Sequence, residues 1–159
     1  MEYKSFKQIL DNPIDIRNGD LTYGNYIAIK NCIRNLNNDD EVKTITDIIK
    51  ELYNYDLQTN DFMVIVPLME KIIADMVYWQ EQEQTMLKYE PTTEEIRVGI
   101  FEYSKKVGDL ATVKSIAKEY AQDPDNILKW KWSKVFGILY TDLESFNFQR
   151  KYTSIISKQ

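Results

Sequence analysis

Apolar residues recur every three or four positions along most of the chain, which is the period of a helix with one buried face. The most apolar stretch is 55–79, where apolar residues cover more than one side of a helix wheel. We therefore expect a buried central helix there, either kinked or begun by Pro67. Only five glycines and four prolines interrupt the sequence. The pattern predicts an all-α protein, a compact multi-helix bundle of about six helices.

Capping signals divide this pattern into elements. The stretch 11–22 carries Pro13 and an Asn18-Gly19 turn signal, which predicts an irregular N-terminal segment or a small hairpin. Expected helix starts follow at Thr22, at Asn38 or Asp39, at Asn60, at a Thr92-Glu95 capping box and at Asp123-Pro124. Gly108 should end the capping-box helix. The last part is predicted as one helix to about residue 152, or as two with a break near 141–142.

A chain of 159 residues with 43% hydrophobic content is long enough for one core of its own. We expect a single helical domain over 1–159, with a possible lobe boundary in the polar stretch 81–91.

The sequence KWKW at 129–132 places two tryptophans on different sides of one predicted helix. At 100° per residue, Trp132 falls in an apolar stripe of core width, whereas Trp130 lies about 160° away. The residues that share or adjoin the side of Trp130 are Gly137, Phe148 and Tyr152. These four form the candidate partner-binding face, because tryptophan and tyrosine are enriched in interfaces. The alternative is that the Trp130 ring folds against the N-terminal segment or the 80–91 connection.

The net charge of −5 is unevenly spread. Residues 129–159 hold six cationic against two acidic side chains, which leaves −9 on residues 1–128. An acidic body repels phosphates, and the lysines of 129–134 spread around the helix, so the sequence disfavours nucleic-acid binding. The asymmetry favours contacts between the tail and the body of another copy or a partner.

Catalytic chemistry has few candidates in this composition. Histidine is absent and Cys32 is the single cysteine, which removes Ser-His-Asp and Cys-His constellations and histidine-based metal sites. Paired carboxylates such as Glu94 and Glu95 fit the positive end of a helix better than acid-base work. We expect no enzymatic activity, no cofactor, no metal and, without an apolar run of bilayer length, no membrane contact.

The order of predicted helices and connecting segments along the chain resembles that of the small helical proteins of tailed bacteriophages known as tail assembly chaperones. The similar segments are LTYGNYIAIKNCIRN, DIIKELYNYD and GDLATVKSIAKEYAQDPDNILKWKWSKVFGILYTDL, which cover roughly two fifths of the chain. The resemblance implies a non-enzymatic protein of the host cytoplasm during assembly that binds a viral structural protein and masks its apolar surface until it polymerises. A permanent virion component, such as a head-tail connector or ring subunit, is similar in size and helicity. A small nucleic-acid-binding regulatory module is the remaining alternative.

Overall fold

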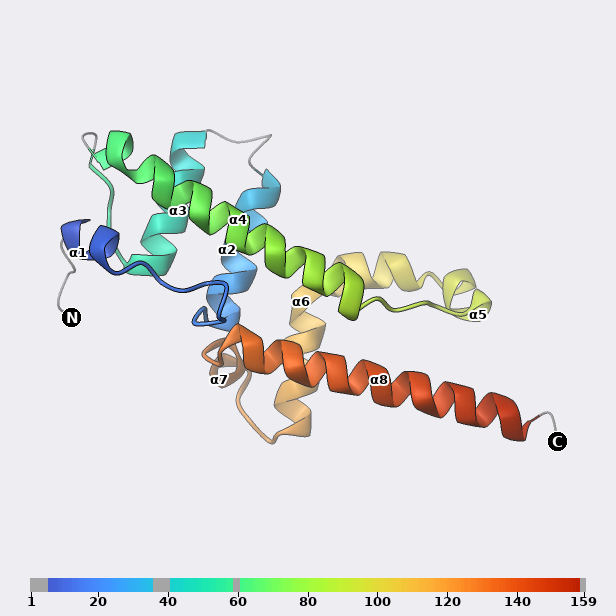
Figure 1. Ribbon diagram of the computed structural model, residues 1–159. Helices are drawn as coiled ribbons and strands as arrows, with labels where there is room; N and C mark the ends of the chain where they lie inside the picture. The colour runs from blue at the N-terminus through green and yellow to red at the C-terminus, as the bar shows by residue number, and fades with distance from the viewer. Residues whose placement is uncertain (1–5, 36–40, 59–60, 158–159) are drawn as a thin grey trace.

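The computed structural model describes residues 6–35, 41–58 and 61–157, and these form an all-helical fold (Figure 1). The elements are α1 (Phe6–Asp11), α2 (Tyr23–Asn35), α3 (Glu41–Tyr53), α4 (Phe62–Met86), α5 (Thr93–Arg97), α6 (Ile100–Glu119), α7 (Pro124–Leu128) and α8 (Trp132–Ile156). The all-α prediction is confirmed. The expected caps at Asn38 or Asp39 and at Asn60 lie outside the described residues.

Local capping signals are confirmed where the structure describes them. The Thr92 side chain accepts a hydrogen bond from the Glu95 amide, and the Glu95 carboxylate accepts one from the Thr92 amide, so the predicted capping box is formed. Hydrogen bonds from the Tyr89 hydroxyl and the Thr92 amide hold the pKa of Glu95 below its usual range. Asp123 caps α7 through the Asp125 amide, directly before Pro124.

Several predicted boundaries are wrong. The capping-box helix α5 ends early, at Arg97, and Gly99 with φ +84° precedes α6. Gly108 with φ +46° kinks α6 and does not end a helix. Helix α4 extends through 81–86, so the polar connection is shorter than expected. The break in the last part of the chain falls at 129–131, and α8 runs uninterrupted through 141–142.

The central helix α4 is buried on one face and not all round. It continues through Pro67 as one helix, with the core side chains Ile65, Leu68, Met69, Ile72, Met76 and Trp79. On its other side Met63 is 88% exposed, and Val66 and Val77 are also exposed. Figure 1 shows α4 and α8 as the two long helices, with α2 and α6 crossing behind them.

An aromatic cluster around Trp132 joins these helices. Its indole stacks on Tyr26, with ring centroids 4.1 Å apart and planes 7° apart, and on Tyr23 at 5.4 Å. Trp79 of α4 and Phe136 of α8 meet it edge-on at 5.9 and 5.7 Å. The prediction that Trp132 belongs to the core is confirmed, since it is 0% exposed.

The irregular N-terminal segment is held against the start of α8. The Tyr23 amide donates to the Trp130 carbonyl and the Trp132 amide to the Leu21 carbonyl, both at 2.8 Å. These two bonds form a single antiparallel bridge between Thr22 and Lys131, in place of the hairpin considered within 11–22. Lys131 also pairs with Asp20 at 2.8 Å.

Gly19→Ala should destabilise the protein by about 2 kcal/mol, because Gly19 has φ +77° and a Cβ there would lie 2.5 Å from the Ser133 Cβ. Gly137→Ala is the matched control: its Cβ would enter open space on a helix, so a gain of about 0.5–1 kcal/mol is expected. Urea unfolding followed by circular dichroism measures both changes. Equal effects of the two substitutions would contradict the close packing of Gly19 on α8.

Candidate protein-interaction site

Three of the four candidate contact residues lie on one side of α8, and the fourth does not. Phe148 is 64% and Tyr152 55% exposed, with their rings stacked at a centroid distance of 6.4 Å. Gly137 lies on the same side of the helix, and a Cβ built there would meet nothing within 4 Å. We call the side of α8 that carries Gly137, Phe148 and Tyr152 the outer face.

Trp130 precedes α8 and belongs to the turn after α7. Its half-buried ring meets Tyr120 edge-on at 5.5 Å, and the Lys134 ammonium lies 3.3 Å from the ring centroid. Counting residues at 1.5 Å each, Trp130 and Phe148 are roughly 25 Å apart along the axis. The ring therefore packs against Tyr120, which follows α6. Trp130 thus lies outside the helix that carries the other three candidates and is distant from Phe148 and Tyr152.

The outer face is exposed because α8 extends beyond the core. The apolar stripe predicted from the helix wheel consists of Leu128, Trp132, Val135, Leu139, Leu143 and Phe146. Leu128, which precedes α8, is half-buried, Trp132 and Val135 are fully buried, and Leu139 and Leu143 are half-buried. Phe146 is already 43% exposed. From Tyr140 to Ile156, which we call distal α8, none of the residues is fully buried.

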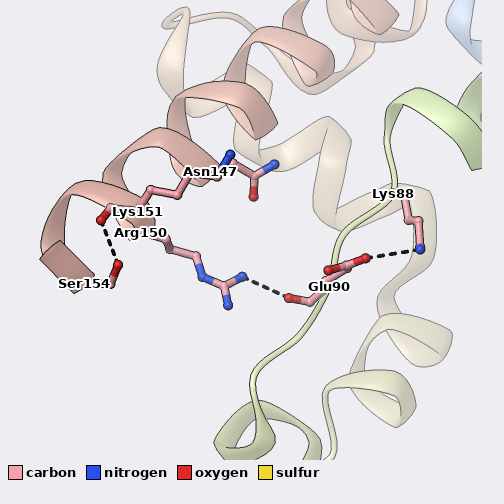
Figure 2. A pocket seen from close by; sticks show the side chains of 6 residues that line it. All are labelled: Lys88, Glu90, Asn147, Arg150, Lys151 and Ser154. Carbon is pink, nitrogen blue, oxygen red and sulfur yellow. Dashed lines mark hydrogen bonds and ion pairs between the residues drawn. The ribbon is translucent and has the colours of Figure 1, made fainter.

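The connection between α4 and α5 holds distal α8 from the opposite side. Tyr89 meets Phe146 with ring centroids 5.8 Å apart, and an Arg150 guanidinium nitrogen donates to the Glu90 carbonyl at 2.9 Å. Figure 2 shows the Arg150–Glu90 hydrogen bond beside an open pocket, which is lined by Lys88, Glu90, Asn147, Arg150, Lys151 and Ser154. Lys88 pairs with Glu90 at 3.2 Å, and five of the six lining residues are exposed. The Tyr89–Phe146 and Arg150–Glu90 contacts beside this pocket support distal α8 from one side.

A second apolar segment was not found from the sequence. Residues 93–110, which we call the arm, comprise α5 and the first half of α6. Its exposed large apolar residues are Ile96, Val98, Phe101, Tyr103 and Leu110, with Val98 84% and Phe101 63% exposed. These residues point in several directions around short helices, so no single-faced stripe marked them. In Figure 1 the arm and distal α8 both extend away from the body toward the same side.

The exposed apolar residues are concentrated on these two segments. Among the described residues, eleven of the seventeen exposed large hydrophobic side chains belong to the arm or to distal α8. A folded monomer normally scatters such residues, whereas a concentration of them marks a contact surface.

The main buried polar centre lies elsewhere, around Lys30. This lysine is 5% exposed and its ammonium pairs with Asp109 at 3.2 Å and Glu83 at 3.5 Å. Burial raises the pKa of Tyr23, with Asp109 adding to it, and burial and the nearby Glu83 raise that of Tyr26. The ammonium of Lys30 and the two carboxylates therefore link α2, α4 and α6.

The described residues contain no group of three or more His, Cys, Asp or Glu side chains placed to hold a metal ion. None of their helices combines the length and apolarity that crossing a bilayer requires. Comparison of the chain with protein-family models, curated proteins and solved structures finds no match.

Trp130→Ala should leave the helical content unchanged and lower the free energy of unfolding by about 1 kcal/mol, because the ring is half-buried. Trp132→Ala should cost about 3–5 kcal/mol, because it removes the centre of the aromatic cluster. Chemical denaturation of both variants provides the comparison. A loss at Trp130 as large as that at Trp132 would show that Trp130 belongs to the core.

Lys30→Met should destabilise the protein by about 2 kcal/mol, because it leaves two partly buried carboxylates without their cation. Lys50→Met is the control, since its pair with Asp56 is exposed on both sides and should contribute less than about 0.5 kcal/mol. Thermal unfolding at neutral pH measures both. If the two variants lost the same stability, the Lys30 centre would not be a structural link.

Proposed function

We propose that this protein is a non-enzymatic bacteriophage assembly protein that binds a viral structural protein, specifically a tail protein, through apolar helix faces. The observation that carries the proposal is the concentration of exposed apolar residues on the arm and distal α8. Interfaces of stable complexes have an apolar, aromatic-rich centre, and these two segments provide such residues on ordered helices.

The mode of binding follows from the state of these segments in the free protein. Both are helical although little of their surface is packed. A partner therefore meets side chains on a preformed backbone, and binding does not have to fix the helices first. Covering an apolar strip of a tail protein in the host cytoplasm would keep that protein from polymerising too early.

A second candidate function is that of a permanent virion component, such as a head-tail connector or ring subunit. The outer face of α8 favours it, because the small residues Gly137 and Thr141 lie at one end and the aromatic pair at the other. Such a face fits a copy of itself. A nucleic-acid module has less support, since Lys131 is paired with Asp20 and Lys134 lies over the Trp130 ring.

The test is reconstitution with candidate partners. The purified protein is mixed with each structural protein encoded beside its own gene, and complexes are measured by light scattering and calorimetry. We expect a complex of fixed stoichiometry with one of them. Phe101→Ser should weaken this complex at least about tenfold, as loss of an aromatic contact at an interface does. Lys106→Ser, an exposed polar change on the same arm, should leave it unchanged.

Absence of a complex with any of these structural proteins would contradict the proposed function. A complex that tolerates Phe101→Ser but not changes on distal α8 would confine the contact to α8.

A further inference from the structure

The outer face of distal α8 has a regular spacing. Thr141, Ser145, Phe148, Tyr152 and Ile155 follow one another at intervals of four, three, four and three residues, and all five are exposed. This is the spacing with which one helix packs along another as a coiled coil. We call these five residues the seam. Its first two members are small and polar, and its last three are large and apolar.

The seam is free to receive a second helix along its whole length. The contacts of distal α8 with its own body, from Phe146 to Tyr89 and from Arg150 to Glu90, lie on the opposite side of the helix. At the inner end of the seam, no atom lies within 4 Å of a Cβ built on Gly137. Thr141 and Ser145 are exposed as well.

Two charged residues flank the seam on one side. Glu144 and Lys151 occupy equivalent positions one heptad apart, and both are exposed. When two such helices pair in opposite directions, equivalent flanking positions face each other, so Lys151 of one copy lies near Glu144 of the other. In a parallel pair these positions lie on opposite sides and do not meet. The charges therefore select the antiparallel arrangement.

Residue size selects the same arrangement. In the antiparallel register that brings Lys151 to Glu144 of the second copy, Phe148 lies beside its Ser145 and Tyr152 across from its Thr141. Large side chains then fill the space that small ones leave, as interdigitated packing requires. On the other flank, Asp142 faces Gln149 of the second copy, which adds no repulsion.

We propose that two copies of this protein pair through the seam of α8 as an antiparallel, twofold-symmetric helix pair. The inference deepens the proposed function, since it rests on the same exposed helix and names a second copy as its occupant. A twofold interface uses one patch on both copies, so each large-on-small contact and each Lys151–Glu144 pair occurs twice.

The size of the contact sets its strength. From Thr141 to Ile155 the seam is about 21 Å long. It is shorter than the three or four heptads of an autonomous coiled coil, so we expect a reversible dimer with a dissociation constant in the roughly micromolar range. The arm remains uncovered and available to a different protein.

The experiment is sedimentation equilibrium of the protein alone over a wide concentration range, at low and physiological salt. We expect a monomer-dimer equilibrium. Phe148→Ser with Tyr152→Ser should raise the dissociation constant at least about tenfold. Phe101→Ser is the matched control, because Phe101 on the arm is 63% exposed and Phe148 64%, and it should leave the dimer unchanged.

A charge reversal then tests the direction of pairing. Glu144→Lys alone and Lys151→Glu alone should each weaken the dimer several-fold, and the double variant should restore it. Circular dichroism of each variant checks that the exposed substitutions keep the fold.

Each remaining outcome overturns the proposal. A monomer at every concentration would show that the seam is kept for a different protein. A dimer indifferent to Phe148→Ser with Tyr152→Ser would place self-association elsewhere, and one indifferent to the charge reversal would exclude this antiparallel register. Because no partner protein is present, these results do not depend on whether the proposed tail-protein complex forms.

Discussion

The stacking of Trp132 on Tyr26 is the contact on which the rest of the structure depends. The two rings lie 4.1 Å apart and nearly parallel, and Tyr23, Trp79 and Phe136 surround them. These side chains come from α2, α4 and α8, so one cluster fixes three helices that are distant in the sequence. Aromatic contacts of this kind add energy and a defined geometry to the burial of apolar area. The start of α8 is thereby placed and oriented, and the position of everything beyond Tyr140 follows from it.

Features that depend on neighbouring residues could be predicted from the sequence, and features that depend on distant ones could not. The Thr92-Glu95 capping box and the Asp123 cap are correct because each is closed by residues within three positions. The break at 129–131 was missed because it is made by Leu21 and Tyr23, more than a hundred residues earlier. The helix wheel placed Trp132 correctly, but Trp130 was placed on a helix that begins only after it.

For the candidate site, too, the sequence pattern predicted what one regular helix determines and not what distant parts of the chain determine. The wheel correctly grouped Gly137, Phe148 and Tyr152, because one regular helix carries all three. The wheel gave no indication that the apolar stripe would become solvent-exposed at Phe146, since this depends on where the other helices end. The arm was missed for a different reason. Its apolar residues lie on short helices beside Gly99 and Gly108, and without a regular period nothing in the pattern separates an exposed apolar residue from a buried one.

Helix α8 thus has two halves with different environments and one continuous backbone. Its first half is fixed by Trp132, Val135 and Phe136 in the core, and its second half is supported from one side by the Tyr89 and Arg150 contacts. No break separates the halves, so the rotation of the first half about its axis determines which side of the second half is free. The seam therefore faces outward as a consequence of the aromatic cluster, although none of its residues contacts Trp132. A change in the core that rotated α8 by one residue, about 100°, would turn Phe148 and Tyr152 away from a partner without altering either residue.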